Sequence, residues 1–321
     1  MQAWRVSELR GIEALTLVPD APEPPPPGEG EISVALTAAA LNYPDLLMLS
    51  GGYQYKPPLP FTPGMEACGR VIAVGEGVSA DLLGQRMVVG SRAGTLCERL
   101  TLPLRGVRPA PEALNDAEAA AFGVGALTAW VAFERGRLAA GERVLVTGAG
   151  GGMGLSAVAV AKALGAEVIA AAGSAAKLAA ARAAGADATL LIDRAAPDFA
   201  DAGALDLVFD PVGGALVPPA LKALRWGGRY LVIGFVGGQA EPVPLNRFLL
   251  KGIEAIGVRA GEAGRQDPAA GRRHIHAIDA LANAGKLHPH IGLSVPLAEA
   301  PRAFAAMAAG DLIGKAVVSI G

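Results

Sequence analysis

The feature that most constrains this chain is a run of glycines that joins a strand-like segment to a helix-like segment. Residues 144–147 are apolar and strand-like, the run GAGGGMG follows at once, and a helix-like segment comes next. In this context a glycine fingerprint indicates dinucleotide binding. The best register predicts that Gly151 lets the backbone approach a pyrophosphate and that Gly154 lets the helix pack on the strand. Gly152 and Met153 would then open a helix whose N-terminal N–H groups face the anion.

The end of the second strand predicts which dinucleotide binds. This strand ends in AAAG, so Gly173 stands near the position where an NAD site carries an acid for the ribose 2′-hydroxyl. Ser174 and Lys177 follow, and a hydroxyl with an ammonium suits a 2′-phosphate, which favours NADPH over NADH. Ser174 is also a candidate cap for the helix that begins near Ala175, with Lys177 on the solvated face of that helix. The two roles are compatible.

The pattern along the chain predicts two kinds of domain. Residues 1–120 contain short strand-like segments rich in β-branched residues, separated by Gly and Pro clusters. From residue 116 onwards, strand-like and helix-like segments alternate, and the strands are almost wholly apolar, as strands buried on both faces of a parallel sheet are. The chain, at 321 residues, is long enough for two domains. We therefore expect an α/β fold in which a β-rich domain accompanies a doubly wound parallel sheet.

The composition excludes several classes of function. Apolar residues make up 52% and charged residues 18%, with a net charge of −2. Such a chain is neither disordered nor basic enough to follow a phosphate backbone. The first residues, MQAWRVSELRG, lack the apolar core of a secretory signal, and Cys68 and Cys97 suit a small place in the core. We expect a cytoplasmic enzyme with neither a nucleic-acid nor a membrane partner.

Segments on both sides of the glycine run resemble the medium-chain dehydrogenase/reductase superfamily. These segments are NYPDLLMLSGGY (42–53), LPFTPGMEACGRVIAVGEGV (59–78), GALTAW (125–130), FDPVGG (209–214), GGRYLVIGF (227–235) and GKAVVSI (314–320). In particular they resemble its zinc-independent quinone oxidoreductase branch, which includes zeta-crystallin. The resemblance implies a GroES-like catalytic domain of residues 1–122, completed by residues 260–321, and a Rossmann NADP-binding domain of residues 123–259. It also implies an active site in the cleft between these domains.

Two positions within this resemblance argue against a catalytic metal. Zinc-dependent members of the superfamily bind zinc through a Cys three residues before an Asp and through a His in a G-H-E segment. Here those positions are Asn42, before Asp45, and Met65, before Glu66. Neither replacement is a thiolate, imidazole or carboxylate, so we predict no metal site and expect Asp45 to orient the Asn42 loop. The histidines form two His-x-His pairs that suit no single ion and are expected at the surface: His274 with His276 and His288 with His290.

A nicotinamide cofactor can reduce a substrate without a metal, because it passes hydride directly to an acceptor that is already polarised. The protein then has to hold cofactor and acceptor together and to hydrogen-bond the oxygen on which charge develops. The resemblance implies that Asn42 and Tyr53 line the acceptor pocket near the nicotinamide, with Tyr53 donating a proton or hydrogen bond. The alternative for Tyr53 is a packing aromatic at a loop end. Further cofactor contacts follow by position: Thr128, Gly234, Phe235 and Val236.

Together these features predict an NADPH-dependent, zinc-independent oxidoreductase that transfers hydride to a quinone. The first alternative is reduction of an activated C=C bond in a 2-enal, an enone or an enoyl- or acryloyl-CoA. The second is a non-catalytic NADPH-binding protein. The expected partner is a small-molecule quinone or conjugated carbonyl. The resemblance also implies a homodimer, paired at the edge of the Rossmann sheet.

Overall fold

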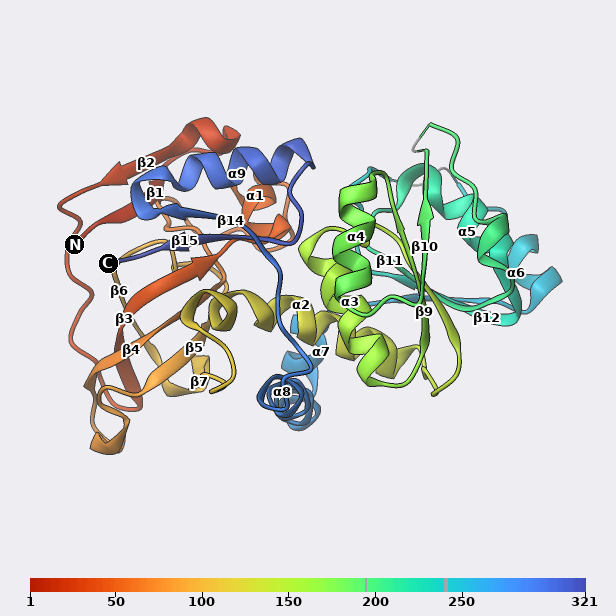
Figure 1. The fold of residues 1–321 in the computed structure, drawn as a ribbon. Helices are drawn as coiled ribbons and strands as arrows, with labels where there is room; N and C mark the ends of the chain where they lie inside the picture. The colour runs from red at the N-terminus through yellow and green to blue at the C-terminus, as the bar shows by residue number, and fades with distance from the viewer. Residues whose placement is uncertain (194, 240–241) are drawn as a thin grey trace. The chain divides into compact units, whose positions relative to one another are not determined.

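The computed structural model describes residues 1–193, 195–239 and 242–321. The chain divides into two compact units, Met1–Val124 with Ile291–Gly321, and Gly125–His290 (Figure 1). The boundaries expected from the sequence assign residues 260–290 to the first domain, whereas they fall in the second unit of the structure. One contact that ties residues 260–290 to the second unit is made by the buried His274. Its Nε2 lies 2.5 Å from Oε2 of Glu134, which belongs to the same unit.

The first unit is a mainly antiparallel sheet to which both ends of the chain contribute. Its described strands follow the order β14-β15-β3-β4-β5-β7, and β6 pairs with β3. The bounds are β3 (Glu31–Ala40), β4 (Glu66–Val74), β5 (Arg86–Gly90), β6 (Arg99–Pro103), β7 (Val107–Pro109), β14 (Ile291–Pro296) and β15 (Lys315–Ser319). A separate hairpin is formed by β1 (Ala3–Val6) and β2 (Leu15–Val18), and the helices of this unit are α1 (Tyr43–Leu49) and α9 (Ala300–Ala309). The C-terminal strand β15 thus completes a sheet begun near the N-terminus.

The second unit is a parallel sheet in the order typical of a Rossmann domain. Its described strands follow the order β10-β9-β8-β11-β12-β13, which is the doubly wound arrangement that reverses between the first and fourth strands. The bounds are β8 (Arg143–Val146), β9 (Glu167–Ala172), β10 (Ala188–Leu191), β11 (Leu205–Asp210), β12 (Leu224–Val232) and β13 (Glu254–Gly257). Ligands of such sheets bind beyond the carboxyl ends of the strands, at the reversal. Here the reversal lies between β8 and β11.

Helices cover both faces of the parallel sheet, with α3 and α4 on one face and α5 and α6 on the other (Figure 1). The bounds are α3 (Gly152–Ala163), α4 (Ala175–Ala183), α5 (Val217–Ala223), α6 (Asn246–Lys251), α7 (Ala260–Gln266) and α8 (Pro268–Asn283). The long helix α2 (Asp116–Arg135) begins in the first unit and ends in the second. The expected α/β fold, a GroES-like domain with a Rossmann domain, is confirmed.

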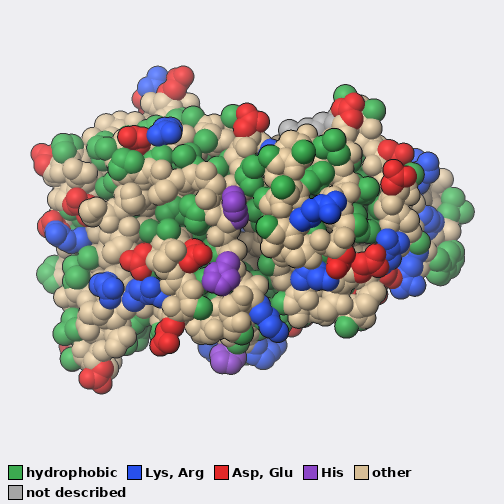
Figure 2. All heavy atoms as spheres, viewed as in Figure 1, with side chains coloured by type: hydrophobic (Ala, Val, Ile, Leu, Met, Phe, Trp, Pro, Cys, Tyr) green, Lys and Arg blue, Asp and Glu red, His purple; other side chains and the backbone are tan. Residues whose placement is uncertain are grey.

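Much of the alanine in this chain is core. Many Ala residues on α2, α3 and β9 are fully or almost fully buried, because the small side chain lets helices approach the sheet and one another closely. They are Ala119, Ala120, Ala121, Ala129, Ala132, Ala157, Ala161, Ala170 and Ala171. Among the described helices, none has the length and apolar character that crossing a bilayer requires. On the face drawn in Figure 2, Lys and Arg side chains are interspersed with Asp and Glu, as a net charge of −2 suggests.

Candidate functional site

The glycine loop of the second unit joins β8 to the first turn of α3. Gly151 is the N-cap of α3, and Gly152 and Met153 form its first positions. A Cβ added to Gly154 would lie 2.3 Å from the carbonyl oxygen of Gly148, so the approach of helix to loop requires glycine there. A Cβ on Gly151 would meet only that same oxygen, at 3.6 Å, which is an ordinary contact. The fold itself therefore leaves open space at Gly151, as the close approach of a pyrophosphate demands.

The start of α4 packs against the same loop. A Cβ on Gly150 would lie 2.4 Å from Lys177 Cβ, so only glycine allows this contact. Ser174 Oγ accepts a hydrogen bond of 3.3 Å from the Lys177 backbone N–H, which makes Ser174 the N-cap of α4, one of the two roles expected for it. β9 ends in buried alanines and Gly173 is exposed. The loop, Ser174 and Lys177 thus lie together, beside a strand end that carries no carboxylate.

A buried carboxylate organises the carboxyl ends of β8 and β11. Asp210 Oδ1 accepts hydrogen bonds from Thr147 Oγ1 at 2.5 Å, the Val212 N–H at 2.8 Å and the Gly213 N–H at 3.0 Å. Its Oδ2 accepts from the Tyr230 hydroxyl. Burial raises the pKa of the Tyr230 phenol well above its usual range, and the charge of Asp210 raises it further, so Tyr230 acts as a donor only.

Two loops at this edge of the sheet, the first after β11 and the second after β12, are held together by backbone hydrogen bonds. The Val236 N–H donates to Pro211 O at 3.3 Å, and the Gly237 N–H donates to Val212 O at 2.8 Å. The second loop carries Phe235 and Val236 outward, with exposed fractions of 55% and 51%. Large apolar side chains held exposed by a fixed loop are suited to contact a flat ring.

In the first unit, the sheet brings Asn42, Glu66 and Lys315 together from distant parts of the sequence. Ala40, the last residue of β3, lies opposite Glu66 on β4 and opposite Val317 on β15. Asn42 follows β3 by two residues, Glu66 opens β4, and Lys315 opens β15. The three side chains are therefore neighbours because their strands are paired, although 273 residues separate Asn42 from Lys315.

These three side chains form a closed, buried set of hydrogen bonds. Lys315 Nζ donates to Asn42 Oδ1 and to Glu66 Oε1, both at 2.7 Å, and Asn42 Nδ2 donates to Glu66 Oε1 at 3.0 Å. Glu66 Oε2 accepts from the Val124 N–H at 2.8 Å. Exposed fractions are 7% for Asn42, 2% for Glu66 and 6% for Lys315. Because an ammonium only donates, Oδ1 of Asn42 must face Lys315, which fixes the orientation of the amide.

Asp45 supports this set from α1. Its Oδ2 accepts the Asn42 backbone N–H at 2.8 Å, so Asp45 orients the Asn42 loop as the sequence predicts. Asp45 is fully buried and its Oδ1 has no hydrogen-bond partner among the described residues. Burial raises the pKa of Asp45 to about 7, although the Asn42 N–H and the charge of Lys315 oppose the shift.

The other expected site residues are divided between the two units. Tyr53 is half-buried and packs on the apolar core of the first unit. Thr128 is half-buried on α2, in the part that belongs to the second unit. Glu66, Asp210 and Lys315 have structural partners that the sequence did not predict. All three lie in segments that carry the family resemblance, but a single chain gives no sign of which distant residues share a cluster.

Of the expectations for the histidines and cysteines, the surface position of His274 is wrong. His274 was expected at the surface but is 4% exposed, because it shares the buried face of α8 with Ile278 and Ala282, four and eight residues further on. His276, His288 and His290 are exposed. Cys68 and Cys97 are core residues as expected, and burial raises the pKa of each thiol to about 12.

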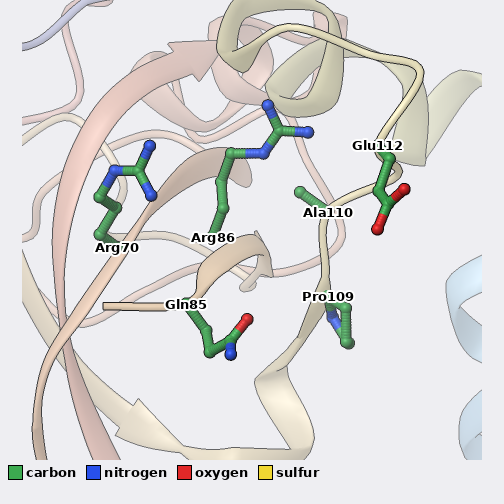
Figure 3. A pocket seen from close by; sticks show the side chains of 6 residues that line it. All are labelled: Arg70, Gln85, Arg86, Pro109, Ala110 and Glu112. Carbon is green, nitrogen blue, oxygen red and sulfur yellow. The ribbon is translucent and has the colours of Figure 1, made fainter. Parts of the chain in front are cut away.

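A polar depression of about 380 Å³ lies on the first unit, lined by Arg70, Gln85, Arg86, Pro109, Ala110 and Glu112. Figure 3 shows the Arg70 and Arg86 guanidinium groups extending the same way from paired positions of β4 and β5. Arg86 already pairs with Asp116 at 3.4 Å and donates to Pro111 O at 2.6 Å. Arg70 also lies four residues along β4 from Glu66, about 13 Å in an extended strand. The depression is therefore separate from the Asn42 cluster.

The residues of the second unit fit a dinucleotide, whereas those of the first do not fit zinc. The glycine loop leaves space for a pyrophosphate at a helix N-terminus. Asn42 and Met65 are not zinc ligands, and the ammonium of Lys315 already occupies the oxygens of Asn42 and Glu66 that a cation would take. Among the described residues, no group of His, Cys, Asp and Glu is arranged to hold a metal.

A two-unit enzyme with a Rossmann nucleotide-binding sheet is the class that this geometry defines. Residues 28–140 match the family described as alcohol dehydrogenase GroES-like domain, and residues 152–274 match the family described as zinc-binding dehydrogenase. Quinone oxidoreductase-like protein 2 of Mus musculus is 34% identical, over 92% of this chain and 87% of the relative.

Solved structures agree over the whole chain. One similar structure is the quinone oxidoreductase of Thermus thermophilus, which has also been solved in complex with NADPH. It is 36% identical to this chain, with a TM-score of 0.84 over 100% of both chains. A mycobacterial protein complexed with NADPH is 28% identical with a TM-score of 0.87, over 99% of this chain and 100% of that one. The chain belongs to the medium-chain dehydrogenase/reductase superfamily and is an oxidoreductase with quinone oxidoreductase-like relatives, as the motif resemblance predicts.

Proposed function

We propose that this protein transfers hydride from NADPH to a quinone without zinc. The observation that carries the proposal is the buried Asn42–Glu66–Lys315 cluster, which puts an amide donor where zinc-dependent members of the superfamily have a metal ligand. An acceptor that is already polarised requires a hydrogen bond at its oxygen and no Lewis acid. The likeness to a quinone oxidoreductase known in complex with NADPH supports the choice of acceptor and cofactor.

The cofactor would be held by backbone and by one positive side chain of the second unit. The N-terminus of α3, with Gly151, Gly152, Met153 and Gly154, receives the pyrophosphate. Gly173, Ser174 and Lys177 face the adenosine ribose, where the ammonium favours a 2′-phosphate. Thr128 would contact the phosphate on the nicotinamide side, and Gly234, Phe235 and Val236 the nicotinamide itself. When bound, the nicotinamide supplies a hydride at C4.

The first unit would serve the acceptor. Asn42 donates an amide N–H to the quinone oxygen, and Tyr53 lines the pocket beside it. The hydride that the nicotinamide supplies would reduce the quinone by two electrons, and Asn42 would hydrogen-bond the oxygen that becomes negative until one proton from solvent completes the hydroquinone. The chain orients the oxygen and excludes water from the reacting carbon.

A cofactor-oxidation screen tests this function. Purified protein is mixed with NADPH and, in separate arms, with 1,4-benzoquinone, 9,10-phenanthrenequinone, a 2-alkenal, an enone and acryloyl-CoA. Saturable oxidation of NADPH with quinones and stoichiometric hydroquinone is the expected result. Turnover with the conjugated carbonyls alone would move the assignment to reduction of a C=C bond, since the same oxygen contact serves an enolate. Tight NADPH binding without turnover of any acceptor would favour a non-catalytic binding protein.

We also propose that the chain pairs with a second copy through the edge of its parallel sheet. β13 is the last strand of the described sheet, and a strand with an open edge is a template for pairing. Near that edge α6 exposes Leu249 and Leu250 by 79% and 69%, its preceding residue Leu245 is 82% exposed, and Trp226 is 73% exposed. So much exposed apolar surface is typical of an interface in a soluble protein. Leu249→Glu should convert a dimer to a monomer in sedimentation, whereas a wild-type monomer would contradict the proposal.

A further inference from the structure

The Asn42–Glu66–Lys315 cluster places a positive charge beside Asn42, the position at which the sequence resemblance puts a metal ligand in zinc-dependent members of the superfamily. Lys315 Nζ donates to one carboxylate oxygen and to one amide oxygen, at 2.7 Å each. Residues 28–140, which include Asn42 and Glu66, match the family described as alcohol dehydrogenase GroES-like domain, yet here the side chain of Lys315 occupies the oxygens that a cation would take. A dication beside a buried ammonium would be strongly repelled, because Coulomb energies are large where water is excluded.

We propose that Lys315 is a positioning residue that replaces the electrostatic role of a metal by polarising the Asn42 amide toward the acceptor's oxygen. A charged donor on Oδ1 draws electron density from the amide, so the Nδ2–H bonds become stronger donors. One Nδ2–H already donates to Glu66 Oε1 at 3.0 Å, which leaves the second to meet the acceptor. This inference rests on the proposed function, which puts Asn42 beside the acceptor.

Other contacts of the cluster keep the ammonium in this role. Glu66 balances the charge of Lys315, so the buried pair is neutral overall. The Val124 N–H bonds Glu66 Oε2, and the Asn42 amide bonds Oε1, so the carboxylate is held in place by two further donors. Glu66 therefore does not turn to chelate Lys315 with both oxygens, and the ammonium stays on the Asn42 oxygen.

Three substitutions at position 315 separate charge from packing. Lys315→Arg keeps the charge, Lys315→Gln keeps an N–H donor without the charge, and Lys315→Met removes both. Lys286→Gln, at an exposed lysine of the second unit, controls for the loss of one positive charge. The readouts are the thermal midpoint, the KM for NADPH and kcat with 1,4-benzoquinone.

We expect kcat to fall about 10- to 100-fold in Lys315→Gln and Lys315→Met. Complete loss of one donor to a developing oxyanion lowers kcat by about 100-fold or more, and here the donor is only weakened. The KM for NADPH should stay unchanged, and Lys315→Arg should recover much of the lost kcat. Equal kcat in Lys315→Gln and wild type, with a stable fold, would overturn the inference. If Lys315→Met does not fold, Lys315→Gln and Lys315→Arg still decide it.

A spectroscopic readout keeps this inference distinct from the proposed function. The side-chain amide protons of Asn42, assigned by their loss in Asn42→Ser, should resonate further downfield in wild type than in Lys315→Gln, because polarisation deshields them. An unchanged resonance would overturn the role of Lys315 even in an active enzyme. A shifted resonance in a protein that reduces no acceptor would instead remove the proposed function and leave the polarisation standing.

Discussion

Each unit of this molecule buries a carboxylate near a strand end, and the two carboxylates are satisfied by different means. Asp210 in the second unit accepts two hydroxyls and two backbone N–H groups. Glu66 in the first unit accepts an ammonium, an amide and a backbone N–H. The first arrangement ties loops together, whereas the second holds a charged group beside a polar donor. Burial of a carboxylate alone therefore does not mark chemistry, and the partners decide which role it has.

The largest effect should come from removing the loop-holding carboxylate. Asp210→Ala leaves Thr147, Tyr230 and two backbone N–H groups without their buried acceptor, which should cost about 3–5 kcal/mol of unfolding free energy. Urea unfolding followed by fluorescence measures the loss. Asp201→Ala, at an exposed carboxylate of the same unit, should change stability by less than about 0.5 kcal/mol. An unfolding free energy in Asp210→Ala equal to that of the wild type would contradict the structural role assigned to this side chain.

The glycine loop separates what the fold needs from what the ligand needs. Gly154→Ala should lower the unfolding free energy by about 1–3 kcal/mol, because its Cβ would meet Gly148 O at 2.3 Å. Gly151→Ala should leave the thermal midpoint of the free protein unchanged but raise the Kd for NADPH about tenfold, or about 1.4 kcal/mol. Calorimetry measures both quantities. Unchanged NADPH affinity in Gly151→Ala would remove the pyrophosphate from this loop.

A smaller effect concerns the choice of cofactor. Lys177→Ala should raise the KM for NADPH about tenfold and leave that for NADH nearly unchanged, because only NADPH carries the 2′-phosphate. Steady-state kinetics with both cofactors make the comparison. Lys222→Ala, at a lysine far along the sequence on α5, serves as the matched control. Equal changes for NADPH and NADH would withdraw the assignment of Lys177.

The stability of the protein should depend on pH through the buried Asp45 of the first unit. The pKa of Asp45 is about 7 in the folded chain and near 3.8 when unfolded, so the folded state binds more protons between these values. Stability should therefore fall as pH rises from about 4 to about 7, and Asp45→Asn should flatten that slope. Thermal midpoints across this range, with Asp20→Asn as an exposed control, test the sign. A slope that persists in Asp45→Asn would show that another group causes it.

The fold of the second unit was largely predictable from the sequence, because the segments of its candidate site are contiguous. A strand, a glycine run and a helix are contiguous, and their backbone builds the loop, so Gly151, Gly154, Ser174 and Lys177 fall close together as expected. The parallel sheet also follows from alternating apolar strands and helices, whereas the order of its strands was not predicted. The boundary at residue 260 did not follow, because the contact of α8 with α2 depends on His274, whose partner is 140 residues away.

The first unit was predictable only in part, for the same reason. Asn42 and its neighbour Asp45 are three residues apart, and their contact was foreseen. The contact of Glu66 with Lys315 spans 249 residues and depends on which strands pair, a question that one sequence leaves open. Tyr53 shows the limit of position alone, since it packs on the core and its role with the acceptor stays a prediction.

The most direct test is the rate at which metal-depleted protein reduces 1,4-benzoquinone with NADPH. The protein is treated with a chelator until mass spectrometry finds zinc far below one atom per chain, and then assayed with and without added zinc. We expect full activity without zinc, no gain on adding it, and hydroquinone equal to the NADPH consumed. Activity that disappears with the metal and returns with zinc would contradict the central claim.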